Sequence, residues 1–124
     1  GALAVECRAD DAAVLAALRP LDHADTHAAV TAERAILAEL EAGCAAPIGA
    51  LAEVVDDEDG PVISLRAVVA ATDGSGDLRR SITGPLGEAE HLGRRLARTL
   101  VADGATALAD LQATHPPTAS EQIQ

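Results

Sequence analysis

Hydrophobic and polar residues alternate in three successive segments in the middle of the chain. Over 62–72 the apolar side chains fall on every second residue, which is the pattern of a strand with one buried face. The segments 48–55 and 77–83 also favour strands, because they contain β-branched or alternating apolar residues. Short turns at 56–60 and 73–76 separate the three segments. The pattern predicts a three-stranded antiparallel meander.

Apolar residues recur at helical spacing before and after these strands. The predicted helices cover 12–18, a stretch from a cap at Asp25 or Thr26 to a stop at Gly43, 88–102 and 105–111. In the second helix we place Glu33 and Glu39 on the solvated side. Helices before and after a meander predict an α+β fold, in which a three-stranded antiparallel sheet has helices packed on one face.

The chain is expected to contain one domain with a short segment at each end. We assign 1–9 to a short buried strand or extended segment, 10–112 to the domain, and 113–124 to a disordered polar tail. The sequence contains no Met and opens on an apolar run, with no basic leader before it. We therefore expect a piece of a longer polypeptide.

Charge and composition exclude several classes of partner. The formal net charge of the 124 residues is −11, from 20 Asp and Glu against nine basic residues. Phosphate backbones and anionic lipids select basic faces, and this chain has no aromatic residue for base stacking, so nucleic acid and membrane are excluded as partners. No stretch approaches the ~20 apolar residues that span a bilayer. Two cysteines form no disulfide framework, which indicates a reducing cytoplasm.

Cys44 is the candidate functional residue of the sequence. It follows the predicted helix stop in a stretch of small residues and proline within 40–49, so its thiol has room around it. The helix C-terminus and the nearby Glu39 and Glu41 are expected to disfavour the thiolate, which argues against a hydrolytic nucleophile. A single attack on an electrophilic carbon needs no strongly stabilised thiolate, so covalent attachment of a cofactor fits better. The alternative is a small apolar filler.

The other candidate side chains give weaker signals. His23 and His27 lie four residues apart, as two metal ligands on a helix would, but no further ligand accompanies them. We predict solvated histidines and no metal. Small basic groups occur at Arg79-Arg80 and at Arg94-Arg95-Arg98, and an anion site from them is only weakly indicated. Arg94 and Arg98 are predicted to share a helix face and to contact acids such as Glu90.

Three stretches of the chain carry a specific combination of residues. They are GALAVECR at 1–8, TAERA at 31–35 followed by LEAGCAAPIG at 40–49, and the pairs Leu92-Gly93 and Gly104-Ala105. In this order they resemble the C-terminal part of the porphobilinogen deaminase family, also called hydroxymethylbilane synthase, over nearly the whole chain up to about Leu111. The sequence departs from the family at Ala42, where the family has glycine, and a helix end tolerates this change.

The resemblance implies a transferase of tetrapyrrole and haem biosynthesis. The family joins four porphobilinogen molecules head to tail, with release of ammonia, to form hydroxymethylbilane. It builds this product on a dipyrromethane cofactor, which a thioether holds to the cysteine that matches Cys44. The resemblance thus assigns Cys44 as the cofactor-binding residue and porphobilinogen as the substrate.

The resemblance also implies a division of labour between three domains. Residues 1–9 match a strand that returns from a missing N-terminal domain, and 10–112 match the C-terminal domain to which the cofactor is attached. The catalytic aspartate and the anion-binding arginines of the family lie in the N-terminal domains. No catalytic residue is therefore assigned in this chain, which alone is expected to be inactive, and the full enzyme is expected to be a cytoplasmic monomer. The alternative, from another class, is a stand-alone acidic interaction domain without catalysis.

Overall fold

A computed structural model describes residues 2–41 and 47–109 of the chain. In order, its elements are α1 (Ala12–Leu18), the 3-10 helix η1 (Arg19–Leu21), α2 (Ala24–Glu39), β1 (Ile48–Asp57), β2 (Gly60–Ala70), β3 (Asp77–Pro85), the 3-10 helix η2 (Leu86–Glu88), α3 (Ala89–Ala102) and α4 (Ala105–Leu108). The predicted tail 113–124 and the candidate residue Cys44 lie outside the described residues.

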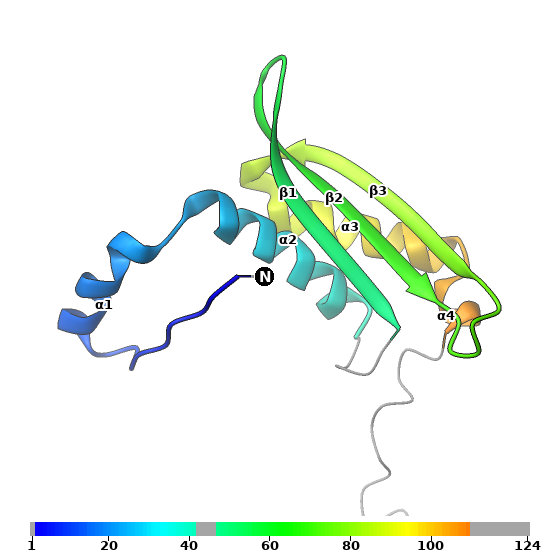
Figure 1. Cartoon of the computed structure of the whole chain (residues 1–124), viewed down its shortest axis with the longest axis horizontal. Coiled ribbons are helices and arrows are strands. Elements are labelled where there is room, and N and C mark those ends of the chain that lie inside the picture. The colour runs from blue at the N-terminus through cyan, green and yellow to red at the C-terminus, as the bar shows by residue number, and fades with distance from the viewer. Residues whose placement is uncertain (1, 42–46, 110–124) are drawn as a thin grey trace, which may run out of the picture.

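The three strands form one antiparallel sheet in the order β1-β2-β3 (Figure 1). β1 and β2 pair from Ile48 opposite Val69 to Asp57 opposite Gly60. Gly60 has a φ of 118°, which glycine adopts without a steric penalty, so the chain can turn tightly after Asp57. β3 pairs along the other side of β2. The predicted three-stranded meander is confirmed.

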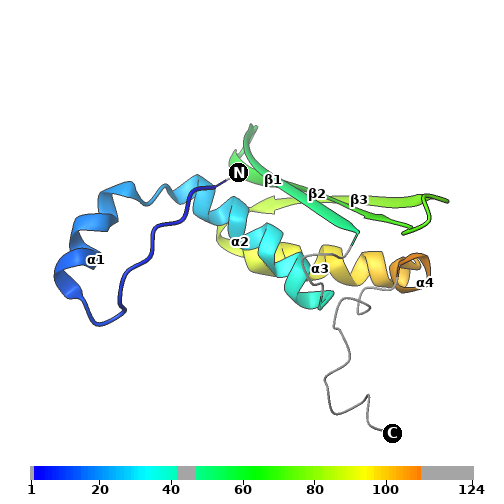
Figure 2. The ribbon, with the colours of Figure 1, turned by 60° about the horizontal axis from the view of Figure 1, so that its bottom comes forward.

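α2 and α3 pack side by side against one face of this sheet (Figure 2). The apolar face of α3 contributes Leu92, Leu96 and Leu100 to the core, as the four-residue spacing predicts. From β2, Ile63 and Leu65 are fully buried in the same core. Each such side chain contributes ~1.5–3 kcal/mol when it leaves water, so this aliphatic layer holds the helices to the sheet. The predicted α+β fold, with helices on one face, is confirmed.

Small residues let α2 and α3 approach closely. A Cβ atom at Gly93 would lie 2.6 Å from the Cβ of Ala35 and would collide with the backbone carbonyl oxygen of Ala32. Both alanines are buried residues of α2. Gly93 is therefore the described glycine with the least room for a larger side chain, and the alanine-rich composition is explained in part by close helix packing.

Residues 2–22 form an arm that extends away from the sheet and its two helices (Figures 1 and 2). No residue of α1 is buried, and Leu3 and Val5 are exposed. Residues 2–8 form neither a helix nor a strand. The chain itself therefore does not form the predicted buried strand, and only the extended alternative agrees with the elongated segment seen in Figure 1.

The start of α2 and the end of α4 differ from the sequence prediction for local reasons. α2 begins earlier than predicted because Nδ1 of His23 caps it, accepting a hydrogen bond from the backbone N of Thr26 at 3.2 Å. The sequence instead favours Asp25 or Thr26 as the cap, because those residue types are preferred there. α4 ends at Leu108, short of the predicted position 111, because Ala109 has extended backbone angles.

Candidate functional site

Cys44 belongs to the connection between α2 and β1, and residues 42–46 of this connection lie outside the described residues. The structure describes its two ends. The end of α2 and the start of β1 lie at the end of the molecule that also holds α4, opposite the turn between β1 and β2 (Figure 1). Leu40, which follows α2, is buried in the core. The helix end that precedes Cys44 is therefore anchored.

The start of β1 is fixed to β2. The carbonyl oxygen of Pro47 accepts a hydrogen bond from the backbone N of Ala70 at 2.9 Å. Ile48 pairs with Val69 and packs against the core. Both described ends of the connection that carries Cys44 are therefore held by the packed part of the domain.

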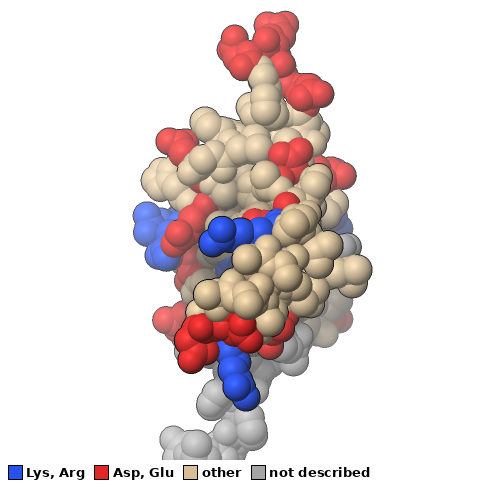
Figure 3. Space-filling model, turned by 90° about the vertical axis from the view of Figure 1, so that its left-hand side faces the viewer, with Lys and Arg blue, Asp and Glu red and all other residues tan. Residues whose placement is uncertain are grey.

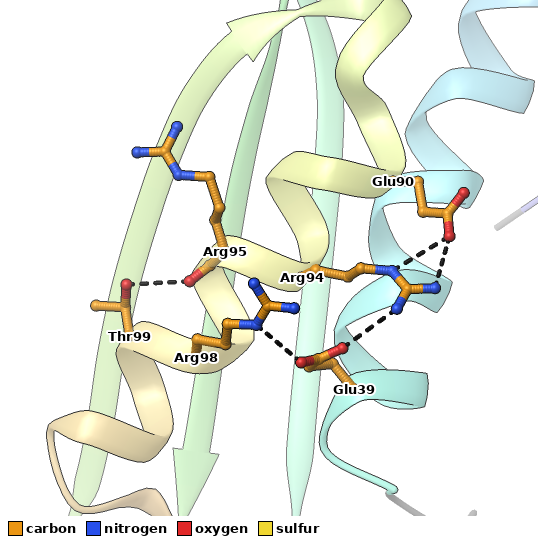
Figure 4. Close-up of polar contacts among 6 residues, drawn as sticks. All are labelled: Glu39, Glu90, Arg94, Arg95, Arg98 and Thr99. Atoms are coloured by element: carbon orange, nitrogen blue, oxygen red, sulfur yellow. Dashed lines mark hydrogen bonds and ion pairs between the residues drawn. The ribbon is translucent and has the colours of Figure 1, made fainter.

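An ion-pair network joins the C-terminal turn of α2 to α3 (Figure 4). Glu39 Oε1 lies 2.9 Å from Arg98 Nε, and Glu39 Oε2 lies 3.5 Å from Arg94 Nη1. Arg94 also pairs with Glu90 at 2.7 Å, as the sequence predicts. The hydrogen bond to Glu90, and then the charge of Glu90, raise the pKa of Arg94. Each pair is partly exposed to solvent and is individually weak.

This network changes the electrostatics expected near Cys44. The sequence alone counts Glu39 as a negative charge close to the thiol, but two guanidinium groups compensate it. The acidic run 56–59 forms the projecting tip between β1 and β2 (Figure 3), and this turn lies at the end of the molecule opposite the end of α2 (Figure 1). The helix end that precedes Cys44 is therefore less negative than the sequence suggests.

The arginines of β3 are also paired with carboxylates. Arg79 Nη2 lies 2.7 Å from Asp77, and Arg80 Nε lies 2.7 Å from Asp103 at the end of α3. Each guanidinium already has a carboxylate partner, which partly compensates its charge.

The two histidines with metal-ligand spacing have separate contacts. His23 caps α2 through Thr26, whereas Nδ1 of His27 lies 3.8 Å from a carboxylate oxygen of Asp22. Within residues 2–41 and 47–109, no three His, Cys, Asp or Glu side chains are grouped closely enough to hold a metal ion. Over the same part of the chain, no helix combines the length and apolar character needed to cross a membrane.

Glu33 contacts the sheet, which the sequence does not predict. Its Oε1 accepts a hydrogen bond from the backbone N of Ala52 in β1 at 2.9 Å. Helical periodicity places Glu33 on the solvated side of α2, but the residue is half-buried beside β1. The available sequence signal is that Glu33 lies in the stretch 31–35, which carries part of the family resemblance.

Comparison with known proteins points to one family. Residues 27–102 match the family model described as porphobilinogen deaminase, C-terminal domain. The chain is 57% identical over 122 residues to a porphobilinogen deaminase of Nocardia farcinica, an overlap of 94% of this chain and 35% of the relative. It is 58% identical over 113 residues to porphobilinogen deaminases of Mycobacterium bovis and Mycobacterium tuberculosis, an overlap of 87% of this chain and 37% of each relative. The chain thus spans little more than a third of the length of these relatives.

Proposed function

This chain belongs to the porphobilinogen deaminase family, and we propose that it is the cofactor-carrying C-terminal domain of a longer transferase. The longer enzyme would join four porphobilinogen molecules head to tail, with release of ammonia, to give hydroxymethylbilane for tetrapyrrole synthesis. The match of residues 27–102 to the C-terminal domain of the family carries this proposal, because that range includes Cys44. The relatives from Nocardia farcinica and Mycobacterium tuberculosis are named as porphobilinogen deaminases, which supports it.

We assign Cys44 as the residue that holds dipyrromethane through a thioether. This bond requires a thiol, and the chain has two cysteines, Cys7 and Cys44. As the aminomethyl carbon of a porphobilinogen loses its amino group, the sulfur of Cys44 forms one S–C bond to that carbon, and the thiol proton leaves with the amine as ammonia. The bound dipyrromethane supplies the pyrrole end to which further units are added, and its permanent bond keeps intermediates on the enzyme.

Location supports Cys44 over Cys7. Cys7 lies on the arm and forms no disulfide within the described part of the chain. Cys44 lies in the sequence between α2 and β1. Leu40 before this connection and Ile48 after it both pack in the core. A tether that is attached to a packed domain starts from a fixed position. Repeated addition of substrate units at one reacting centre requires such a position.

Exposed apolar side chains on the arm support a preceding domain. Leu3 is fully exposed, and Val5 and Leu21 are 64% and 68% exposed. Covering apolar surface is favourable by ~25 cal/mol per Å², so a partner surface for the arm would stabilise the protein. We propose that the arm packs on the preceding part of the longer polypeptide, with residues 1–9 as the returning strand. That part would supply the catalytic aspartate and the arginines that bind the substrate's carboxylates.

Limited proteolysis tests this placement of the arm. In the isolated chain, a protease specific for arginine is expected to cleave first after Arg8, because this residue lies on an exposed segment without regular structure. In the longer polypeptide the same bond should be protected. Arg34 is the matched control, since it is exposed but lies within α2 and should resist cleavage in both proteins. Equal cleavage after Arg8 in the two proteins would contradict the packing of the arm.

The division of labour between domains is tested by activity. The isolated chain is expected to consume no porphobilinogen, because the proposed acid catalyst lies in the preceding part, whereas the longer polypeptide should release ammonia from it. The rate of ammonia release from both proteins at equal concentration gives the comparison. Turnover by the isolated chain would show that the catalytic acid lies within it.

A stand-alone acidic interaction domain without catalysis is the second candidate function. The net charge of −11 and the exposed arm favour it. It predicts a free Cys44 thiol even when the protein is made with its preceding domains, whereas the enzyme proposal predicts a pyrrole adduct. In the enzyme proposal the protein is a monomer of the cytoplasm, where a reducing environment keeps the thiol available for attachment.

A further inference from the structure

We infer that Glu33 is a positioning residue that ties α2 to β1 and thereby holds the two elements on either side of Cys44 in their relative places. This inference rests on the proposed function, in which Cys44 carries dipyrromethane. The tie is the 2.9 Å hydrogen bond from the backbone N of Ala52 to Oε1 of Glu33. This bond joins a side-chain oxygen of the helix directly to a backbone donor of the strand.

The Ala52 N–H is available to Glu33 because β1 is an edge strand. The sheet order is β1-β2-β3, so β1 has a neighbour on one side. Successive N–H groups of an antiparallel strand point alternately toward and away from the neighbouring strand, and that of Ala52 points away from β2 to meet Glu33. Ala52 itself is only 7% exposed. Loss of the carboxylate would leave this donor facing the groove between β1 and α2 without its protein partner.

The groove between α2 and β1 is one place where small side chains face each other. It is lined in part by the short side chains of Ala29, Val30 and Ala50. Contacts between such small side chains change little when a helix slides by a fraction of an ångström, because they interlock little. A hydrogen bond is directional and short, so the Glu33 carboxylate fixes the helix against the strand.

Two further polar contacts of α2 and β1 connect these elements to other neighbours. Glu39 ties the end of α2 to α3 through Arg94 and Arg98, and Pro47 ties the start of β1 to β2 through Ala70. Among the side-chain hydrogen bonds of the described residues, the one from Ala52 to Glu33 joins α2 directly to β1. Glu33 therefore sets the relation between the two elements that flank the tether.

The test measures the rate at which the longer polypeptide, produced without cofactor, gains pyrrole mass from porphobilinogen. Glu33→Gln keeps an acceptor oxygen and should load at the wild-type rate, whereas Glu33→Met fills a similar volume without an acceptor and should load about tenfold more slowly or worse. Ile63→Val is the stability control, because it removes one buried methyl group from β2 opposite Val54, away from the start of β1. At a comparable loss of melting temperature, Ile63→Val should load like wild type.

The possible outcomes separate the inference from the proposed function. Wild-type loading by Glu33→Met, or equally slow loading by Glu33→Met and Ile63→Val, would overturn the positioning role while leaving Cys44 as the tether. A wild-type polypeptide that gains no mass from porphobilinogen would overturn the proposed function and the inference with it. If Glu33→Met fails to fold, Glu33→Asp replaces it, since its carboxylate is one methylene too short to reach Ala52. Slow loading of Glu33→Asp is expected, and wild-type loading would again overturn the role.

Discussion

Replacing Cys44 by serine in the longer enzyme is expected to abolish the attachment of dipyrromethane and to lower porphobilinogen turnover at least about a hundredfold, because the growing chain loses its tether. Serine has nearly the size of cysteine, but its unactivated hydroxyl is a much weaker nucleophile than a thiol. The fold should survive, since the exchange replaces one sulfur atom by oxygen and keeps the rest of the side chain. Intact mass and the rate of ammonia release measure the two effects.

Cys7→Ser is the matched control for this experiment. It removes the other thiol of the chain, which lies on the arm and has no role in the proposed chemistry. The Cys7→Ser enzyme should carry the adduct and turn over like wild type. Retained turnover in Cys44→Ser, or loss of the adduct in Cys7→Ser, would show that Cys44 is not the tether.

Gly93→Ala is expected to destabilise the folded chain by ~2–3 kcal/mol, although alanine is the better helix former. The added methyl group would collide with the carbonyl oxygen of Ala32 and with the Cβ of Ala35, so α2 and α3 must separate. A loss of this size corresponds to a fall in melting temperature of about 10 °C or more for a domain of this length. Thermal unfolding followed by circular dichroism measures it.

Gly87→Ala supplies the comparison for the packing argument. A Cβ at Gly87 meets no atom within 4 Å, and its φ is not positive, so this substitution should change the free energy of unfolding by less than about 0.5 kcal/mol. An unchanged melting temperature for Gly93→Ala would mean that the close contact between α2 and α3 does not limit stability.

The sheet and the helix α3 are predicted by the sequence because their patterns are strong and local. Alternation over β2 and the leucines spaced by four in α3 both reflect one buried face, and both elements lie where the pattern puts them. The exposure of the arm does not follow from hydrophobic pattern, because Leu3 and Val5 look like core residues but are exposed in the described part of the chain. The His23 cap is missed because histidine is an uncommon cap, although its Nδ1 can accept a hydrogen bond.

The site is predicted from the sequence only through a specific motif. Cys44 is selected by its place in the stretch 40–49 and by the family resemblance, since periodicity gives a single cysteine no role. Helical periodicity also predicts that Glu33 and Glu39 lie on the solvent-exposed side of their helix. Glu33 instead meets the backbone of β1, and Glu39 meets two arginines of α3. Both contacts join residues far apart in the sequence, so they depend on the packing of the helices and could not be read from local pattern.

Peptide mass spectrometry of the wild-type longer enzyme tests the central claim most directly. Cleavage at arginine releases Cys44 in the peptide 35–66, whereas Cys7 leaves in a separate peptide that ends at Arg8. We predict that peptide 35–66 carries the added mass of two pyrrole units and that the Cys7 peptide is unmodified. An unmodified peptide 35–66, or an adduct on the Cys7 peptide, would contradict the assignment of Cys44 as the cofactor tether.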